Sequence, residues 1–253
     1  MSGTHLTVDG ISLAFGGLQV LNDVSLSVGD SELLALIGPN GAGKTTVFNC
    51  ISGLYRPDGA IRLNGESLLG RKPHEVAALG IARTFQHGEV PAQMSVVDAV
   101  LAGRHARIRM NPLAEMLSLP AARREDERHR AAVGDLLRLC DLSAVAERTV
   151  GSLAFGTQKI VGTARALAAE PALLLLDEPS AGLTQEEREA MARLIMRTKH
   201  TLGLPMIWIE HDMQMVADLA DRIHVLDYGR SLADGPPDEV LANTDVVAAY
   251  LGA

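Results

Sequence analysis

A glycine-rich segment of the sequence has the residue types needed to bind a chain of phosphates. Residues 38–45 fit the pattern G-x-x-x-x-G-K-[ST]; they are Gly38, Pro39, Asn40, Gly41, Ala42, Gly43, Lys44 and Thr45, and Thr46 follows. In such a loop the backbone N–H groups surround an anion, the lysine reaches the β- and γ-phosphates, and the hydroxyl is placed for Mg²⁺. A glycine-rich turn that precedes Lys-Thr by chance is the alternative. An apolar run before the segment and a helical stretch after it favour the phosphate site.

A second candidate site lies where an apolar run ends in two acids. Leu173–Leu176 is followed by Asp177 and Glu178. An acid at the tip of a strand can hold Mg²⁺, and a neighbouring carboxylate can orient and deprotonate an attacking water. The alternative is that both acids only end the strand and begin a turn at Pro179. Because the phosphate loop lies upstream, we assign the metal role to Asp177 and the role of catalytic base to Glu178.

The N-terminal part of the chain is expected to supply the strands around the phosphate loop. Apolar residues alternate over 6–13 and 20–28, which predicts two strands. Leu33–Ile37 is a continuous apolar run, typical of a strand buried on both faces. A helix is expected from Gly43 to about Ser52, followed by a short strand over 60–64.

The middle of the chain has a different, helical character. Helices are predicted around 95–105 and 121–140, and apolar strands alternate with helical stretches again from Leu173 onwards. This alternation predicts a parallel sheet. The expected fold class is therefore α/β, with a helical insertion in a nucleotide-binding core.

Composition narrows the classes of function. The 253 residues are 47% hydrophobic and 21% charged, which suits a folded domain rather than a disordered chain. A net charge of -8 argues against a nucleic-acid partner. Cys50 and Cys140, in a chain without an apparent secretory leader, are expected to be reduced thiols. No apolar run is long enough to span a bilayer, so another chain would have to hold this one at a membrane.

These motifs resemble those of the ATPase subunits of ABC transporters, over nearly the whole chain. Residues 177–183 resemble their Walker B strand and D-loop, and Glu210-His211-Asp212 resembles their switch histidine. The resemblance implies ATP and Mg²⁺ as ligands, with His211 at the γ-phosphate. Gln86 matches the Q-loop glutamine, which contacts Mg²⁺ and the attacking water. Phe15 matches the aromatic residue that stacks on adenine, although a core position is the alternative for this residue.

The resemblance also implies a division of the chain. Residues 1–253 would form one ABC ATPase domain with a P-loop (RecA-like) core and an N-terminal antiparallel β subdomain. The core is expected over 1–86 and 157–235, the helical subdomain with the signature segment over 87–156, and a C-terminal tail over 236–253.

The signature segment departs from the family pattern. The family has LSGGQ or LSYGQ, whereas this chain has Leu153, Ala154, Phe155, Gly156 and Thr157, followed by Gln158. In the family this segment contacts the ATP held by the opposite subunit, and Ala154 replaces the serine that reaches its γ-phosphate. Backbone N–H groups at the start of the following helix remain. We expect pairing with a different, related ATPase subunit, and a homodimer is the alternative.

Within the family the chain most resembles the ATPases of importers for branched-chain amino acids and their amide and urea relatives. This resemblance rests on 80–86, Phe15-Gly16-Gly17, the length of the helical insertion and the tail 249–252. It implies permease subunits, an extracytoplasmic solute-binding protein, and a peripheral location on the cytoplasmic face of the inner membrane. Two alternatives stay open: a non-transport ABC ATPase that acts on DNA or ribosomes, and a regulatory subunit with weak or no hydrolysis.

Overall fold

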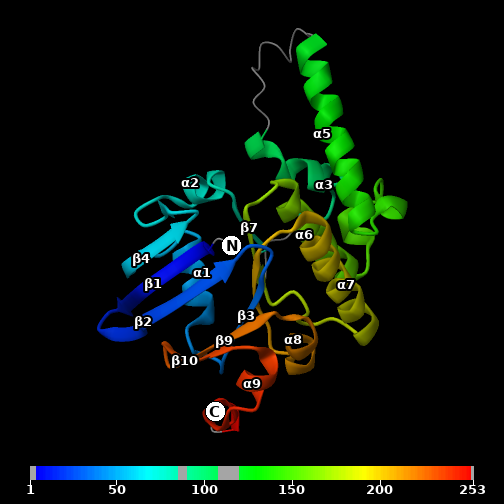
Figure 1. The fold of residues 1–253 in the computed structure, drawn as a ribbon. Coiled ribbons are helices and arrows are strands. Elements are labelled where there is room, and N and C mark those ends of the chain that lie inside the picture. Colours follow the sequence, from blue (N-terminus) through cyan, green and yellow to red (C-terminus); the bar gives the residue numbers. More distant parts are fainter. Residues whose placement is uncertain (1–3, 85–89, 108–119, 252–253) are drawn as a thin grey trace. The chain divides into compact units, whose positions relative to one another are not determined.

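The computed structural model describes residues 4–84, 90–107 and 120–251 (Figure 1). The chain divides into two compact units. The first comprises Met1–Arg83, Ala172–Ala181 and Thr198–Ala253, and the second comprises Thr84–Pro171 and Gly182–Arg197.

An antiparallel sheet opens the first unit. Its strand order is β2-β1-β4-β5, with β1 Thr4–Phe15, β2 Leu18–Gly29, β4 Asp58–Leu63 and β5 Glu66–Ser67. In β2, Leu21 and the alternate residues Val24, Leu26 and Val28 are buried. The alternation in the sequence therefore predicted both long strands correctly, although each extends beyond the expected range.

The second sheet of this unit carries the strands that end near the candidate site. Its order is β10-β9-β3-β8-β7-β6, with β3 Leu33–Ile37, β6 Ile81–Thr84, β7 Leu173–Asp177, β8 Met206–Ile209, β9 Arg222–Asp227 and β10 Arg230–Gly235. Strand β3 runs parallel to β8 and β9, and β7 runs parallel to β8. Every residue of β3, β7 and β8 is buried, which explains their continuous apolar runs. The expected parallel sheet is confirmed.

Helix α1, Lys44–Ile51, lies between the two sheets (Figure 1). Its Val47, Phe48 and Ile51 are fully buried in one core cluster with residues of both sheets. Burial of this face fixes the helix that begins at the phosphate loop, because each large buried side chain contributes about 1.5–3 kcal/mol. The remaining helices of this unit are α2 Pro73–Ala78, α8 Met213–Leu219, α9 Pro237–Leu241 and α10 Thr244–Leu251.

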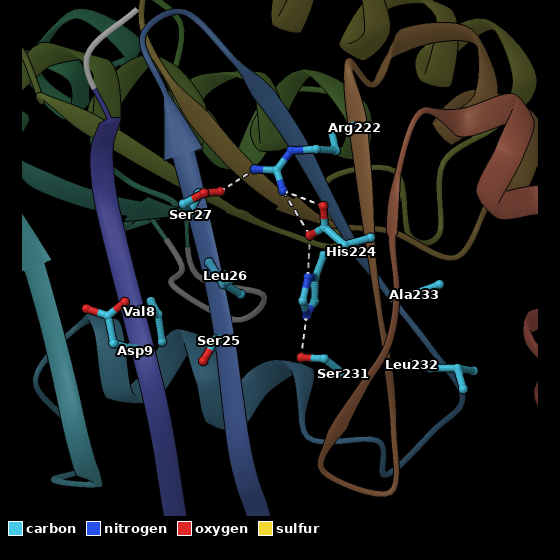
Figure 2. A pocket seen from close by; sticks show the side chains of 11 residues that line it. Val8, Asp9, Ser25, Leu26, Ser27, Arg222, His224, Ser231, Leu232 and Ala233 are labelled. Atoms are coloured by element: carbon cyan, nitrogen blue, oxygen red, sulfur yellow. Dashed lines mark hydrogen bonds and ion pairs between the residues drawn. The ribbon is translucent and has the colours of Figure 1, made fainter.

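A buried histidine connects β9 to β10. The two ring nitrogens of His224 lie 2.6 Å from Asp234 Oδ2 and 3.0 Å from Ser231 Oγ. These residues line an open hollow of about 540 Å³, together with Val8 and Asp9 of β1 and Ser25, Leu26 and Ser27 of β2 (Figure 2). The imidazole is 1% exposed, so we interpret this Ser-His-Asp chain as a structural connection rather than a nucleophile.

The second unit is helical. It contains α3 Val96–Gly103, α5 Pro120–Leu139, α6 Phe155–Ala168, most of α7 Gln185–Leu202, and three short 3-10 segments, His105–Arg107, Ser143–Val145 and Val150–Ser152. Helices α3 and α6 approach closely, since a Cβ on Gly103 would lie 2.1 Å from the Arg165 carbonyl oxygen. In the described ranges, no helix is long and apolar enough to cross a bilayer.

The boundary of this helical unit differs from the range 87–156 expected from the sequence. Helix α6 and most of α7 belong to it, although the sequence placed both in the core. The physical reason is packing: α3, α5 and α6 contact one another and bury Val100, Val133 and Val161 between them. Helical periodicity shows that a face is apolar but does not show which neighbour covers it.

Candidate functional site

The phosphate loop lies between β3 and α1, and its backbone has the positive φ angles that glycine permits. Gly38 has φ 145° and Gly43 has φ 106°. A Cβ on Gly38 would lie 2.0 Å from the Leu226 carbonyl oxygen of β9, so only glycine fits there. Asn40, Gly41 and Thr45 are exposed, so this side of the loop faces solvent.

Lys44 is folded back onto this loop. Its Nζ donates hydrogen bonds of 2.6 Å to Gly38 O and 2.9 Å to Pro39 O, and the residue is 6% exposed. Burial lowers the pKa of the Lys44 ammonium, and the charge of Glu178 partly opposes that shift. The ammonium thus lies inside the loop, where a phosphate oxygen would be a stronger partner than a carbonyl.

Three adjacent strands, β3, β7 and β8, bring their carboxyl ends to one edge of the sheet. The phosphate loop follows β3, Asp177 ends β7 opposite Ile209 of β8, and His211 follows β8. In open α/β sheets ligands bind at this edge. The structure therefore brings Lys44, Asp177, Glu178 and His211 together in the first unit.

Asp177 is a buried carboxylate in an ion pair. Its Oδ2 accepts a 2.7 Å hydrogen bond from Arg83 Nη2, and the side chains are 4% and 9% exposed, respectively. Carboxylate and hydroxyl oxygens, such as those of Asp177 and Thr45, are the donors that Mg²⁺ prefers, so the donor set fits this ion. Arg83 was not among the residues expected at the site, although a charged residue near the end of the short strand β6 was a visible signal in the sequence.

Glu178 and His211 form a contact at the same edge. His211 Nε2 lies 3.1 Å from Glu178 Oε1. Glu178 has a left-handed backbone, φ 46°, and its N–H donates to Ile209 O at 3.0 Å. A non-glycine residue in this region is strained, and such strain often occurs at functional sites.

A second buried carboxylate lies directly beside this pair. Glu210 is 2% exposed; its Oε1 accepts from the backbone N–H of His211 at 2.9 Å, and its Oε2 accepts from that of Ser180 at 3.4 Å. Glu210 therefore links the segments that carry His211 and Glu178. The sequence showed it only as part of Glu210-His211-Asp212, without a role of its own.

Phe15 is at the surface and not in the core. Its side chain is 46% exposed, and its ring meets Tyr55 edge-on, with centroids 5.1 Å apart and an interplanar angle of 71°. The core alternative for Phe15 is thus wrong. An exposed ring held by a second aromatic residue is free to stack on a planar ligand.

The signature segment belongs to the second unit and opens α6. Leu153 and Gly156 are buried, whereas Ala154 and Phe155 are exposed and Thr157 is partly buried. Ala154 is the N-cap of α6 and offers no side-chain hydrogen bond. Glu187 of α7 instead accepts a 3.0 Å hydrogen bond from Gly156 N. Gln86, the remaining candidate residue, lies outside the described residues.

Comparison with known families shows the family to which the chain belongs. The family model "ABC transporter" matches residues 21–181, more than half of the chain. The chain belongs to the ABC transporter family. It is an ATP-binding cassette that hydrolyses ATP, as members of this family do, and as an ATP-binding subunit it acts with membrane permeases.

Two curated relatives extend over the whole cassette. The chain is 40% identical, over 100% of its length and 99% of the relative, to the high-affinity branched-chain amino acid transport ATP-binding protein BraF of Pseudomonas aeruginosa. It is 38% identical, with the same coverage, to LivG of Escherichia coli, which has the same description. A second family model, "Branched-chain amino acid ATP-binding cassette transporter", matches residues 230–253 of this cassette.

Solved structures confirm the expected fold of the cassette. An ATP-binding cassette of an ABC transporter in its ADP conformation has a TM-score of 0.87 and 28% identity, with 100% of both chains covered. A nucleotide-free cassette from an ABC transporter has a TM-score of 0.85 and 28% identity, over 99% of this chain and 100% of that one.

Proposed function

We propose that this cassette powers the import of branched-chain amino acids or related small solutes. ATP hydrolysis by this site is supported by one observation: Lys44, Asp177, Glu178 and His211 lie together at one edge of the sheet. The solute is inferred from relatives, because the names of BraF and LivG specify branched-chain amino acid transport. The match at residues 230–253 to a model for cassettes of that transport class supports the same solute.

Each residue of the site has a proposed role toward ATP and Mg²⁺. Lys44 and the N–H groups of residues 38–46 bind the β- and γ-phosphates, and Phe15 stacks on adenine. Thr45, Asp177 and Gln86 hold Mg²⁺, which neutralises charge on the phosphates when it is bound.

Glu178 is the proposed general base, and His211 stabilises the γ-phosphate. The 3.1 Å contact between them places the His211 ring nitrogen beside the Glu178 carboxylate, so the imidazole orients the carboxylate. A water hydrogen-bonded to Glu178 would then be deprotonated as it attacks.

The proposed assembly contains two ATPase subunits, permease subunits and an extracytoplasmic solute-binding protein. The cassette would lie on the cytoplasmic face of the inner membrane. Segment 153–157 would meet the ATP that a second ATPase subunit holds. Because Ala154 supplies no hydroxyl, we infer that the second subunit is a different, related chain, which makes the two ATP sites unequal.

Purification of the tagged chain from its native membranes in mild detergent tests this assembly. We expect two hydrophobic permeases and a second ATPase subunit to copurify, and leucine uptake by the reconstituted complex to require ATP. Lys44→Ala should abolish uptake and hydrolysis, whereas Lys72→Ala, at an exposed lysine of the same unit, should affect neither. Recovery of ribosomes, DNA or only soluble proteins would contradict the transport role and leave the ATP site standing.

A further inference from the structure

Arg83 connects three parts of the ATP site that are distant in the sequence. The residue lies in β6 and is buried together with Asp177. Its guanidinium donates from Nη2 to Asp177 Oδ2 and from Nη1 to Asn49 Oδ1, each at 2.7 Å. It also lies over the ring of Phe48, 5.5 Å from the centroid. Phe48 and Asn49 belong to α1, the helix that begins at Lys44.

This fork has a geometry that lysine cannot reproduce. A guanidinium is planar and holds two hydrogen bonds in fixed directions while its face stacks on an aromatic ring. The two hydrogen bonds join the end of β7, at Asp177, to α1, the helix that follows the phosphate loop. Because the contacts lie inside the site, the position of the carboxylate depends on the position of α1.

The charge of Arg83 is as important as its shape. A buried carboxylate without a counter-charge is very unfavourable, and removal of one partner from a buried ion pair is strongly destabilising. Asp177 is 4% exposed, so water can solvate it only poorly. The Arg83 guanidinium supplies a positive charge at 2.7 Å from the Asp177 carboxylate.

We propose that Arg83 is a positioning residue of the ATP site, which holds Asp177 against α1 and supplies a positive charge beside its carboxylate. This inference rests on the proposed metal role of Asp177. It assigns to Arg83 a role toward Asp177 rather than toward ATP. Asp177 would hold Mg²⁺ while it keeps its ion pair with Arg83.

Thermal unfolding of the nucleotide-free protein in EDTA tests the coupling between the two residues. We expect Arg83→Gln to lower Tm by on the order of 10 °C, because it removes one charged partner of a buried ion pair. In an Asp177→Asn background, the same substitution should lower Tm by only a few degrees, since no charge remains to be balanced. Equal losses of Tm in the two backgrounds would overturn the proposal.

The response to the metal provides a readout that a merely structural arginine would not change. Mg²⁺ with ADP should raise the Tm of Arg83→Gln by more than it raises that of the wild type, because the cation replaces the missing charge. Arg104→Gln is the matched control: Arg104 is also a buried arginine, paired with Glu170 in the second unit at 2.8 Å. This variant should lose stability without any extra response to Mg²⁺.

These two experiments distinguish failure of the proposed Mg²⁺ site from failure of the proposed role of Arg83. A wild type that does not respond to Mg²⁺ with ADP counts against the proposed metal site, whereas the comparison in EDTA needs no nucleotide and tests Arg83 alone. If Arg83→Gln does not fold, Arg83→Lys takes its place, with a smaller expected loss of Tm that also shrinks in the Asp177→Asn background. For Arg83→Gln, a rise of Tm with Mg²⁺ no larger than that of the wild type would contradict the counter-charge role; Arg83→Lys keeps the positive charge and should respond to Mg²⁺ as the wild type does.

Discussion

Glu187 Oε1 accepts a hydrogen bond of 3.0 Å from the backbone N–H of Gly156, in the first turn of the signature helix. Its other oxygen accepts from Thr184 N at 3.0 Å and so caps α7 as well. Hydrogen bonds from Thr184 and from Gly156 lower the pKa of this carboxyl. One carboxylate thus caps the first turns of both α6 and α7. The Gly156 N–H, one of the groups expected to face a phosphate, is therefore already paired within the protein.

The first prediction concerns this cap. Glu187→Ala should speed hydrogen exchange at the amide of Gly156 and lower Tm, because Ala154 cannot take over as the cap. Glu187→Gln keeps an acceptor oxygen and should retain most of the protection. Amide exchange followed by NMR or mass spectrometry measures both, with Glu186→Ala as the neighbouring control. Equal exchange at Gly156 in the wild type and the three variants would mean that the hydrogen bond from Gly156 to Glu187 does not stabilise the start of α6.

The second prediction concerns the contact between Glu178 and His211. Glu178→Gln should bind ATP normally and lower turnover by about 10²–10⁴, the usual contribution of a general base. His211→Ala should also slow turnover, and the double variant should be little worse than the slower single one, since the two groups act together. Steady-state hydrolysis by the reconstituted complex and binding of a fluorescent ATP analogue measure the two effects. Fast turnover by Glu178→Gln would place the base elsewhere.

Local sequence patterns predicted the strands that are buried on both faces. The apolar run Leu33–Ile37 matches β3 from end to end, and the run from Leu173 ends at Asp177 as β7 does. These predictions succeeded because a parallel strand covered on both faces excludes polar residues along its length. The phosphate loop was equally clear, since its glycines and Lys44 are contiguous.

Contacts between distant residues could not be predicted in this way. Arg83 and Asp177 are in different strands, and nothing local in either segment indicates the partner. Glu210 would be expected at the surface as an isolated charge, but N–H groups of His211 and Ser180 compensate its burial. Thr184 and Glu187 do form a local T-x-x-E capping pattern, so the sequence held part of that signal.

The third prediction concerns the exposed aromatic pair. Phe15→Ala should weaken ATP binding by about tenfold or more, because stacking of a base on an aromatic ring contributes about 1–3 kcal/mol. Phe15→Tyr should retain affinity, and Tyr55→Leu should weaken binding less, since it removes only the edge-on support. Inorganic triphosphate, which has no base, should bind all variants alike. Leu202→Ala, at another exposed apolar residue, serves as the control in the same calorimetric titrations.

The last prediction concerns the acid stability of the connection between β9 and β10. Asp234 pairs with Arg222 at 2.6 Å and with His224 at 2.6 Å. Burial raises the pKa of the Asp234 carboxyl, but the hydrogen bonds and charges of His224 and Arg222 outweigh this effect, so the pKa is lowered below 3.8. The folded state therefore binds this proton less readily than the unfolded state.

The ionised Asp234 carboxylate therefore stabilises the folded protein, and protonation at low pH removes this contribution. Asp234 stabilises the protein fully above the pKa of the unfolded carboxyl, and this contribution is lost as the pH falls below 3.8 through the folded pKa. Asp234→Asn should cost about 1–2 kcal/mol at pH 7, a value reduced for the partial exposure of the side chain. Urea unfolding at pH 7, 5 and 3.5 should show a constant deficit at the two higher values and a smaller one at the lowest. Asp9→Asn, on the same hollow but 3.5 Å from an exposed Arg62, should show no such trend. A deficit that grows toward low pH would reverse the assigned sign and point to an Asp234 that is destabilised by its burial.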